Sequence, residues 1–348
     1  MNVLVTGHHG YIGSITVPLI VAAGHNVTGA DTGLYDGCEF YSMEQLARER
    51  RVDVRDLGQH DLEGFDAVVH LAALSNDPLG ALAPELTLEI NCNATVRLAR
   101  AARDAGVQRF VFASSCSMYG AAGTEEALTE EASLAPLTAY AESKVRAEKA
   151  LLLLADESFS PVFMRNATAF GASPRLRLDI VLNNLVGWAL TTGKVRILSD
   201  GTPWRPLVHV QDIAAATVAM LEAPREVVHG QAFNVGSNRD NYRVSELAQI
   251  VRGVVDDCEI EYAGNGDPDP RSYRVDFGKL ERALPELHIE WDAERGAREL
   301  VAAYRAAGLT RAQFEGSRFV RLRRLEEQLA TGALAGDLRW RQPVAAHG

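Results

Sequence analysis

Three glycines near the start of the chain restrict its fold more than any other feature. Residues 2–13 read NVLVTGHHGYIG, a short apolar run followed by Gly7, Gly10 and Gly13 at intervals of three. Between a strand and a helix, the first glycine permits a tight turn, the second lets backbone N–H groups approach a diphosphate, and the third lets the helix pack closely on the strand. The spacing predicts the first βα unit of a dinucleotide-binding fold.

The rest of the N-terminal half alternates apolar runs with segments of helical period. Runs such as DAVVHLAA and RFVFASS are followed by stretches in which apolar residues recur every three or four positions, as at Leu86, Ile90, Ala94 and Leu98. Strand and helix in strict alternation produce βαβ units, which build a parallel sheet covered by helices on both faces. We therefore predict an α/β fold in which residues 1–170 form a doubly wound, parallel-sheet Rossmann domain.

The second half of the chain is less regular. Residues 171–204 and 239–310 mix loops, helices and short strands, which predicts a smaller, mixed α/β lobe for substrate binding. Residues from about 205 to 238 are expected to return to the first domain. Residues 311–348 contain FVRLRRLEEQLATGAL, whose leucines share one helical face, so they are predicted to form a C-terminal packing helix and a tail.

Charge and cysteine content exclude several kinds of partner and site. The chain carries a net charge of −11, whereas nucleic acids and anionic membranes attract basic surfaces. No apolar stretch is long enough to span a bilayer and no signal peptide precedes the first strand, so we expect a cytoplasmic protein. The cysteines form no CxxC pair, so we expect reduced thiols and predict neither a metal site nor a disulfide framework: Cys38, Cys92, Cys116 and Cys258.

Asp31 ends the second apolar run and bears on the choice of cofactor. A carboxylate at this place accepts hydrogen bonds from the adenine ribose hydroxyls and repels a 2′-phosphate, and residues 30–37 contain no Lys or Arg. The predicted cofactor is therefore NAD rather than NADP. By the same reasoning, Asp53, after the third run, is expected near the adenine.

Tyr140 and Lys144 lie four residues apart in TAYAESKVRAEKALLLL, which places them on one face of a predicted helix. A free phenol has a pKa of about 10, so it becomes a base at pH 7 only after a shift of about three units, or roughly 4 kcal/mol. A neighbouring ammonium and a positively charged nicotinamide would favour this shift. The pair is therefore predicted to handle a proton during hydride transfer.

These motifs together resemble those of the extended short-chain dehydrogenase/reductases that modify nucleotide sugars, a family of epimerases, decarboxylases and 4,6-dehydratases. The resemblance covers roughly residues 2–300. It implies a bound NAD and a nucleotide-diphosphate sugar substrate. It rests on TGHHGYIG, Asp31, HLAA at 70–73, Asn91, SSCSMYG at 114–120, YAESK, RNATAFG, WRPLVHVQDIA and RSYRVD.

The resemblance also assigns roles to individual residues. Ser115 is expected to bind the sugar hydroxyl that is oxidised, Tyr140 to act as the base and Lys144 to activate it. Arg205 and Arg271 are expected to bind the nucleotide diphosphate. The implied cofactor contacts are Gly7, Gly10, Tyr11, Ile12, Gly13, Asp31, Asp53, Val54, Leu71, Ala72, Ala73, Asn91, Tyr140 and Lys144. The implied substrate contacts are Ser75, Ser115, Ser117, Thr168, Asn183, Asn184, Arg205 and Arg271, where Asn184 and Asn183 are near-equivalent candidates.

Four positions depart from the family's patterns. The 4,6-dehydratases carry an Asp-Glu pair directly after the catalytic residue, where this chain has Cys116 and Ser117, and 3,5-epimerising relatives have a cysteine at the place of Ser117. Thr168 stands in place of a substrate-binding asparagine, and Ser75 in place of a lysine of the bacterial 4-epimerase. A separate acid or base role for Cys116 or Ser117 is left open.

The leading hypothesis is an NAD-dependent epimerase that acts at C4 by transient oxidation and re-reduction of the sugar. The alternatives are a 4-ketoreductase or dehydrogenase of a deoxysugar, a decarboxylase of nucleotide-linked uronic acids, and a non-catalytic dinucleotide-binding sensor. The resemblance further implies a homodimer, joined by a four-helix bundle from the helices near residues 80–104 and 136–155.

Overall fold

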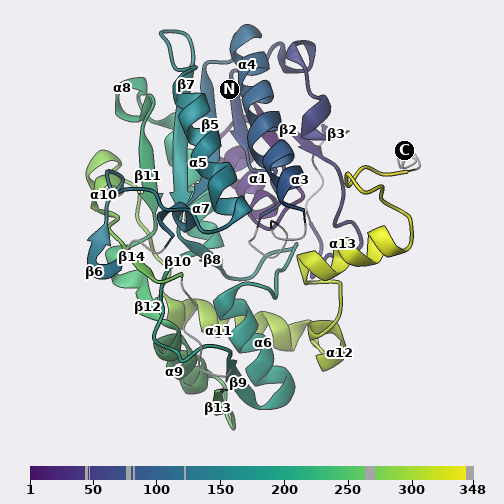
Figure 1. Cartoon of the computed structure of the whole chain (residues 1–348), viewed down its shortest axis with the longest axis vertical. Coiled ribbons are helices and arrows are strands. Elements are labelled where there is room, and N and C mark those ends of the chain that lie inside the picture. The colour runs from purple at the N-terminus through teal and green to yellow at the C-terminus, as the bar shows by residue number, and fades with distance from the viewer. Residues whose placement is uncertain are drawn as a thin grey trace.

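The computed structural model describes residues 1–43, 46, 48–75, 80, 83–120, 123–262 and 271–341. Its largest sheet has seven parallel strands, which confirms the predicted doubly wound α/β fold (Figure 1). In spatial order the strands are β11 (Ala232–Val235), β7 (Ser160–Asn166), β5 (Arg109–Ser115), β4 (Ala67–His70), β1 (Asn2–Thr6), β2 (Asn26–Asp31) and β3 (Glu49–Arg51).

Helices cover both faces of this sheet, because successive side chains of a strand point to opposite sides. In β1, Val3 and Val5 join the core under α1 (Gly13–Ala22) and α7 (Val210–Glu222). Leu4 joins the core on the other face, under α4 (Thr95–Asp104) and α5 (Ala139–Leu152). All three side chains are fully buried, and each such burial stabilises the fold by about 1.5–3 kcal/mol.

A second core lies in the lower half of Figure 1, where α6 (Val181–Thr192), α9 (Val244–Val254) and α11 (Ala293–Ala306) pack together. Two small sheets accompany these helices: β8 (Thr168–Phe170) with β10 (Trp204–His209) and β12 (Asn241–Arg243), and β9 (Lys194–Ile197) with β13 (Glu259–Tyr262). Within residues 205–238, α7 and β11 belong to the large sheet and its covering helices, whereas β10 pairs with β8 and β12.

The other elements are short. They are α3 (Pro84–Leu88), the π-helix η3 (Glu89–Ala94), the 3₁₀ turns η1 (Val54–Asp56), η2 (Gln59–Leu62), η4 (Cys116–Tyr119) and η5 (Asn238–Asp240), α8 (Arg225–Val228), α10 (Gly278–Ala283), and β6 (Gly123–Leu128) paired with β14 (Tyr273–Val275). Within the described ranges, the helices are too short or too polar to cross a membrane.

The C-terminal segment lies against the loop that follows β2. This contact is made by α13 (Arg321–Ala330) and the chain to residue 341, drawn in yellow in Figure 1, whereas α12 (Arg311–Phe314) packs against α6. Leu325 is fully buried, as the leucine pattern predicts for a packing helix. Gln328 Nε2 donates to the carbonyl oxygen of Leu34 (2.9 Å), and Trp340 Nε1 donates to that of Thr32 (2.8 Å). Residues 342–348 of the predicted tail lie outside the described residues.

Candidate active site

A cavity of about 670 Å³ opens at the carboxyl ends of the parallel strands, where ligands bind in sheets of this type. It is lined by the glycine turn, by the ends of β2, β4, β5 and β7, by α5, and by residues of the second core and of the C-terminal segment. Every site residue predicted from the sequence lines this cavity except Asn91 and Asn183. Residues more than 250 positions apart in the chain thus meet in one cavity.

The glycine turn has no room for side chains. Gly7 has φ +74°, and a Cβ atom there would lie 2.7 Å from the backbone nitrogen of Ala72. A Cβ on Gly10 would lie 3.0 Å from the carbonyl oxygen of Gly7, and one on Gly13 would overlap that same oxygen. Because α1 begins at Gly13, the positive end of its dipole lies beside the cavity and favours an anion there. This cradle fits the diphosphate of NAD.

Two aspartates line the cofactor end of the cavity and differ in their partners. The carboxylate of Asp31 accepts hydrogen bonds from the backbone N–H groups of His9 (3.2 Å) and Gly33 (2.8 Å), so its position is fixed at the end of β2. Asp53 forms a two-pronged ion pair with Arg55, at 2.9 and 2.6 Å. The charge of Asp53 is therefore balanced by Arg55, and the ribose contact of Asp31 stays a prediction.

Lys144 is a buried residue of the cavity lining, one helical turn after Tyr140 on α5. Its Nζ donates to the carbonyl oxygen of Ala113 (2.7 Å) and lies 4.6 Å from the ring centre of Phe112 and 5.9 Å from that of Tyr140. Burial lowers the pKa of Lys144 to about 8, and Glu148, one turn further along, opposes this shift. Lys144 is thus a cation at pH 7 that loses its proton easily.

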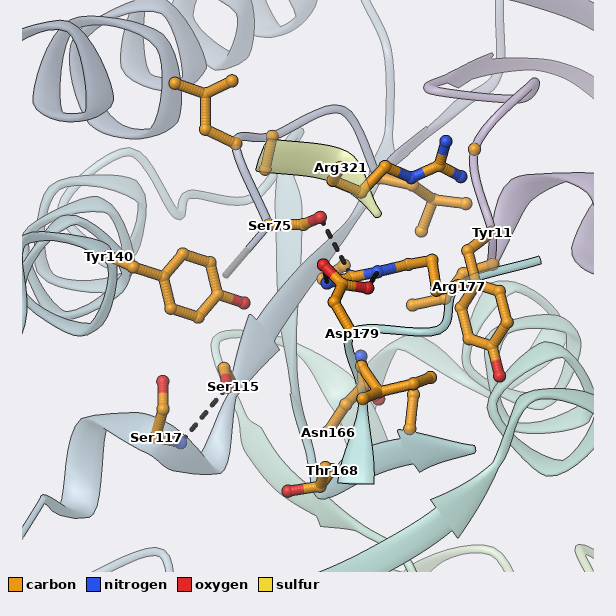
Figure 2. Close-up of a pocket in the computed structure, with 18 of the residues that line it drawn as sticks. Tyr11, Ser75, Ser115, Ser117, Tyr140, Asn166, Thr168, Arg177, Asp179 and Arg321 are labelled. Carbon is orange, nitrogen blue, oxygen red and sulfur yellow. Dashed lines mark hydrogen bonds and ion pairs between the residues drawn. The ribbon is translucent and has the colours of Figure 1, made fainter. Parts of the chain in front are cut away.

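Ser115 and Ser117 line the cavity where β5 ends, on the same side of the view as Tyr140 (Figure 2). Ser115 Oγ accepts a hydrogen bond from the backbone N–H of Ser117 (3.1 Å), which starts the turn η4. Ser117 Oγ and Asn166 Oδ1 are buried and have no hydrogen-bond partner among the described residues. Polar atoms in this state at a cavity wall are suited to binding a ligand.

Cys116 points in the opposite direction. Its thiol is 1% exposed, donates to the carbonyl oxygen of Arg165 (3.0 Å) and belongs to the core under α1 and α7. Burial raises the pKa of Cys116 well above its usual value. Cys116 therefore lies outside the cavity lining and keeps its proton, which argues against the acid or base role that the sequence left open for it.

The two asparagines that do not line the cavity hold its walls in place. Asn91 accepts from the backbone N–H of Leu74 (2.8 Å) and donates to the carbonyl oxygen of Leu74 (3.0 Å) and to Ser143 Oγ (3.2 Å). Asn183 is fully buried and binds both backbone groups of Gly171 (3.0 and 3.2 Å). The structure therefore places Asn91 and Asn183 outside the cavity lining, with each amide bonded to backbone, and their ligand contacts stay predictions.

The predicted substrate contacts Ser75, Thr168, Asn184, Arg205 and Arg271 all line the cavity. The guanidinium of Arg205 donates to the carbonyl oxygen of Arg271, so the two predicted diphosphate-binding residues lie together. Asn184 Nδ2 donates to a backbone carbonyl oxygen in the loop that precedes α6 (2.8 Å).

The comparison with known families agrees with this geometry. Residues 3–236 match the model of the NAD dependent epimerase/dehydratase family. The chain belongs to this family. The enzyme is therefore an NAD-dependent member of the extended short-chain dehydrogenase/reductases, as its motifs predict, and its cofactor is NAD.

Several relatives are similar over most of the enzyme. The UDP-glucose 4-epimerase of Bacillus subtilis is 28% identical over 333 residues, which cover 87% of this chain and 95% of that protein. UDP-glucose 4-epimerase 4 of Oryza sativa subsp. japonica is 32% identical over 331 residues, with 86% and 88% covered. The solved structure of MoeE5 in complex with UDP-glucuronic acid and NAD has a TM-score of 0.75 at 27% identity, with 88% of this chain and all of that chain covered.

Sequence reasoning missed an ion pair in the middle of the cavity. Arg177 binds Asp179 through two hydrogen bonds (2.9 and 3.0 Å), and its Nη1 donates to Ser75 Oγ (3.2 Å), as Figure 2 shows. The alternation of arginines with buried leucines in SPRLRLD was the available signal. The positive charge of Arg177 thus lies next to Ser75, the residue that stands in place of a lysine of the bacterial 4-epimerase.

The C-terminal helix also contributes to the cavity, which its sequence did not indicate. Arg321 of α13 and Leu338 line the cavity near the loop after β2. The Arg321 guanidinium lies 3.9 Å from the ring centre of Tyr35, and its Nη2 donates to the carbonyl oxygen of Arg175 (3.0 Å). The segment predicted only to pack therefore closes the cofactor end of the cavity.

Proposed function

We propose that this enzyme epimerises a nucleotide-diphosphate sugar at C4. The observation that carries the proposal is the cavity wall after Ser115. A dehydratase needs an acid and a base next to this residue, but Cys116 faces the core and Ser117 has no ionisable group. The wall therefore holds Ser115, Tyr140 and Lys144, the groups that oxidation and reduction of a hydroxyl require. It lacks the adjacent acid and base that an elimination requires.

The carboxylates of the cavity support this choice. Among the described lining residues they are Asp31, Asp53 and Asp179. Asp31 accepts two backbone hydrogen bonds at the cofactor end, Asp53 is paired with Arg55, and Asp179 is paired with Arg177. Each of the three is engaged in the protein, so none is free to act as the general acid or base of an elimination.

The proposed chemistry is proton transfer on the enzyme's own residues. NAD, when bound against the glycine turn, would supply the hydride acceptor and donor for C4 of the sugar. Tyr140 takes the hydroxyl proton as the C4–H bond breaks and gives it back after the carbonyl group has turned. Ser115 Oγ binds the same hydroxyl, and the Lys144 ammonium stabilises the phenolate. Oxidation and reduction cancel over one cycle, so no redox partner is consumed.

The substrate is proposed to be a UDP-hexose. Relatives that cover most of the chain are named UDP-glucose 4-epimerases, and one at 24% identity is named UDP-glucuronate 4-epimerase. Arg205 and Arg271 lie together on the cavity wall, where their charges suit a nucleotide diphosphate. The small side chains of Ser117 and Thr168 leave room for the sugar to turn.

The test is NMR of the products formed from UDP-glucose, UDP-galactose and UDP-glucuronic acid, with the absorbance of NADH followed in parallel. Interconversion of a C4 epimer pair without net NADH formation is expected, and Tyr140→Phe should abolish it. Stoichiometric formation or consumption of NADH would instead establish a ketoreductase or dehydrogenase, and release of CO₂ a decarboxylase. Binding of NAD without turnover of any sugar nucleotide would establish a sensor.

A homodimer formed by the helices near 80–104 and 136–155 is part of the proposal. The exposed positions of α4 and α5 are mainly charged, and include Arg97, Arg100, Arg146 and Lys149. The proposal also includes a cytoplasmic location, for which the four cysteines would remain reduced thiols. Light scattering during size-exclusion chromatography tests the dimer, and Arg97→Glu combined with Arg146→Glu should weaken it if these helices meet.

A further inference from the structure

Two consecutive histidines in the glycine turn face a glutamate of the edge strand, outside the cavity described above. His9 Nε2 lies 3.4 Å and His8 Nε2 lies 3.6 Å from Glu49 Oε1. One ligand atom from each of the three residues lies within 4.8 Å of the other two. Imidazole and carboxylate are both common ligands of transition metals.

His8 is the unusual member of this cluster. Its side chain is 4% exposed, and neither ring nitrogen makes a well-formed hydrogen bond among the described residues, although the backbone of Ala30 lies beside the ring. Such a state is rare for a buried polar group unless a ligand completes it. Strand β2 makes space for the ring with Gly29, since a Cβ atom there would overlap the imidazole. The fold therefore holds His8 where its Nε2 faces His9 and Glu49.

Two of the three ligand separations suit a metal site, and the third, between the two histidines, lies within 4.8 Å. With metal–ligand bonds of about 2.0–2.2 Å, tetrahedral geometry separates neighbouring ligand atoms by about 3.3–3.5 Å. The two measured separations, 3.4 and 3.6 Å, are close to this value before any ion is present. We propose that His8, His9 and Glu49 bind a divalent transition-metal ion of the Zn²⁺ type, with a water molecule in the fourth position.

Such an ion would fasten the phosphate-binding turn to the edge of the sheet. β3 is the edge strand of the large sheet, pairs with Gly29–Asp31 of β2 and has exposed side chains. His8 and His9 lie between Gly7 and Gly10, and the backbone N–H of His9 also binds the carboxylate of Asp31. The ion is therefore structural, because its ligands lie outside the substrate cavity and stabilise the backbone that binds the cofactor.

The experiment uses the full chain without an affinity tag, stripped with a chelator and titrated with ZnCl₂ by calorimetry and with Co²⁺ by visible absorption. We expect one ion per chain and the intense absorption of tetrahedral Co²⁺. Glu49→Gln and His9→Ala should each weaken binding by about tenfold or more. Both side chains are partly exposed, so these variants should fold, which circular dichroism checks.

His60→Ala is the matched control. His60 and Glu63 form the same pair of residue types at 3.2 Å, but their side chains are 95% and 59% exposed. This variant should bind Zn²⁺ like the wild type, and Zn²⁺ should raise the melting temperature of both but not that of Glu49→Gln. The proposal is overturned if the wild type does not bind Zn²⁺, or if Glu49→Gln and His9→Ala bind it as tightly as the wild type does. Either result would leave a plain His–Glu hydrogen bond at this place.

Discussion

Replacing Lys144 with Met tests whether its charge, and not its bulk, makes Tyr140 a base. Lys144 Nζ lies 5.9 Å from the centre of the Tyr140 ring, and its pKa of about 8 leaves it protonated at pH 7. At about 6 Å and an effective dielectric constant of about 20, a unit charge stabilises the phenolate by about 2.8 kcal/mol. This energy corresponds to a shift of about two pH units.

The expected result is a pH-dependent loss of turnover. At pH 7 the kcat of Lys144→Met should fall by about 100-fold, and it should recover by about tenfold per pH unit as the solution is made more alkaline. The assay is epimer interconversion at saturating substrate between pH 7 and 9. The NAD content of each preparation is measured in parallel, because Lys144 is also expected to hold the nicotinamide ribose.

Lys149→Met is the control, since Lys149 is exposed on the same helix and its replacement changes the net charge equally. Its kcat should stay within about twofold of the wild type, as expected for a surface substitution. A loss in Lys144→Met that is equally large at every pH, with full NAD content, would refute the electrostatic reasoning and leave only a packing role for Lys144.

Three further predictions concern the surroundings of the site. Cys116→Ala should leave kcat within about twofold, because the thiol faces the core; a loss of turnover with intact circular dichroism would contradict this. Gly13→Ala should abolish NAD binding, measured as bound NAD after gel filtration, because its Cβ overlaps the carbonyl oxygen of Gly7; retained NAD would contradict it. Burial lowers the pKa of His70 from 6.5 to about 3, so between these pH values His70 is protonated in the unfolded chain but neutral in the folded chain. Stability should therefore fall by roughly 4 kcal/mol as pH decreases from 6.5 toward 3, and urea unfolding of His70→Asn should lack this part of the dependence.

Local features of the cofactor site could be predicted from the sequence because short-range geometry determines them. The spacing of Gly7, Gly10 and Gly13 after an apolar run leaves few conformations for the turn. Tyr140 and Lys144 share a helix face because the helical period places residues four apart on the same side. Asp31 ends a strand, so its carboxylate had to lie at the edge where ligands of a parallel sheet bind.

Which of two neighbouring side chains faces the cavity depended on tertiary packing. Asn184 lines the cavity, whereas the side chain of Asn183, one residue earlier on α6, is hydrogen-bonded to the backbone of Gly171. Ser117 lines the cavity, whereas Cys116 enters the core. A one-residue rotation of a helix or turn exchanges such roles, and only the elements packed against it select one rotation.

The groups that complete the site come from distant parts of the chain and were decided by the tertiary structure alone. The pairing of Arg177 with Ser75, the approach of Arg321 from the last long helix, and the meeting of His8 with Glu49 all join residues far apart in sequence. The local periodicity of the sequence does not predict such a contact, because the contact forms only after the sheet and its covering segments have packed. The sequence by itself determined the enzyme family and the shared helix face of Tyr140 and Lys144, whereas the walls around them were determined by the fold; the role of Tyr140 as the base stays a prediction.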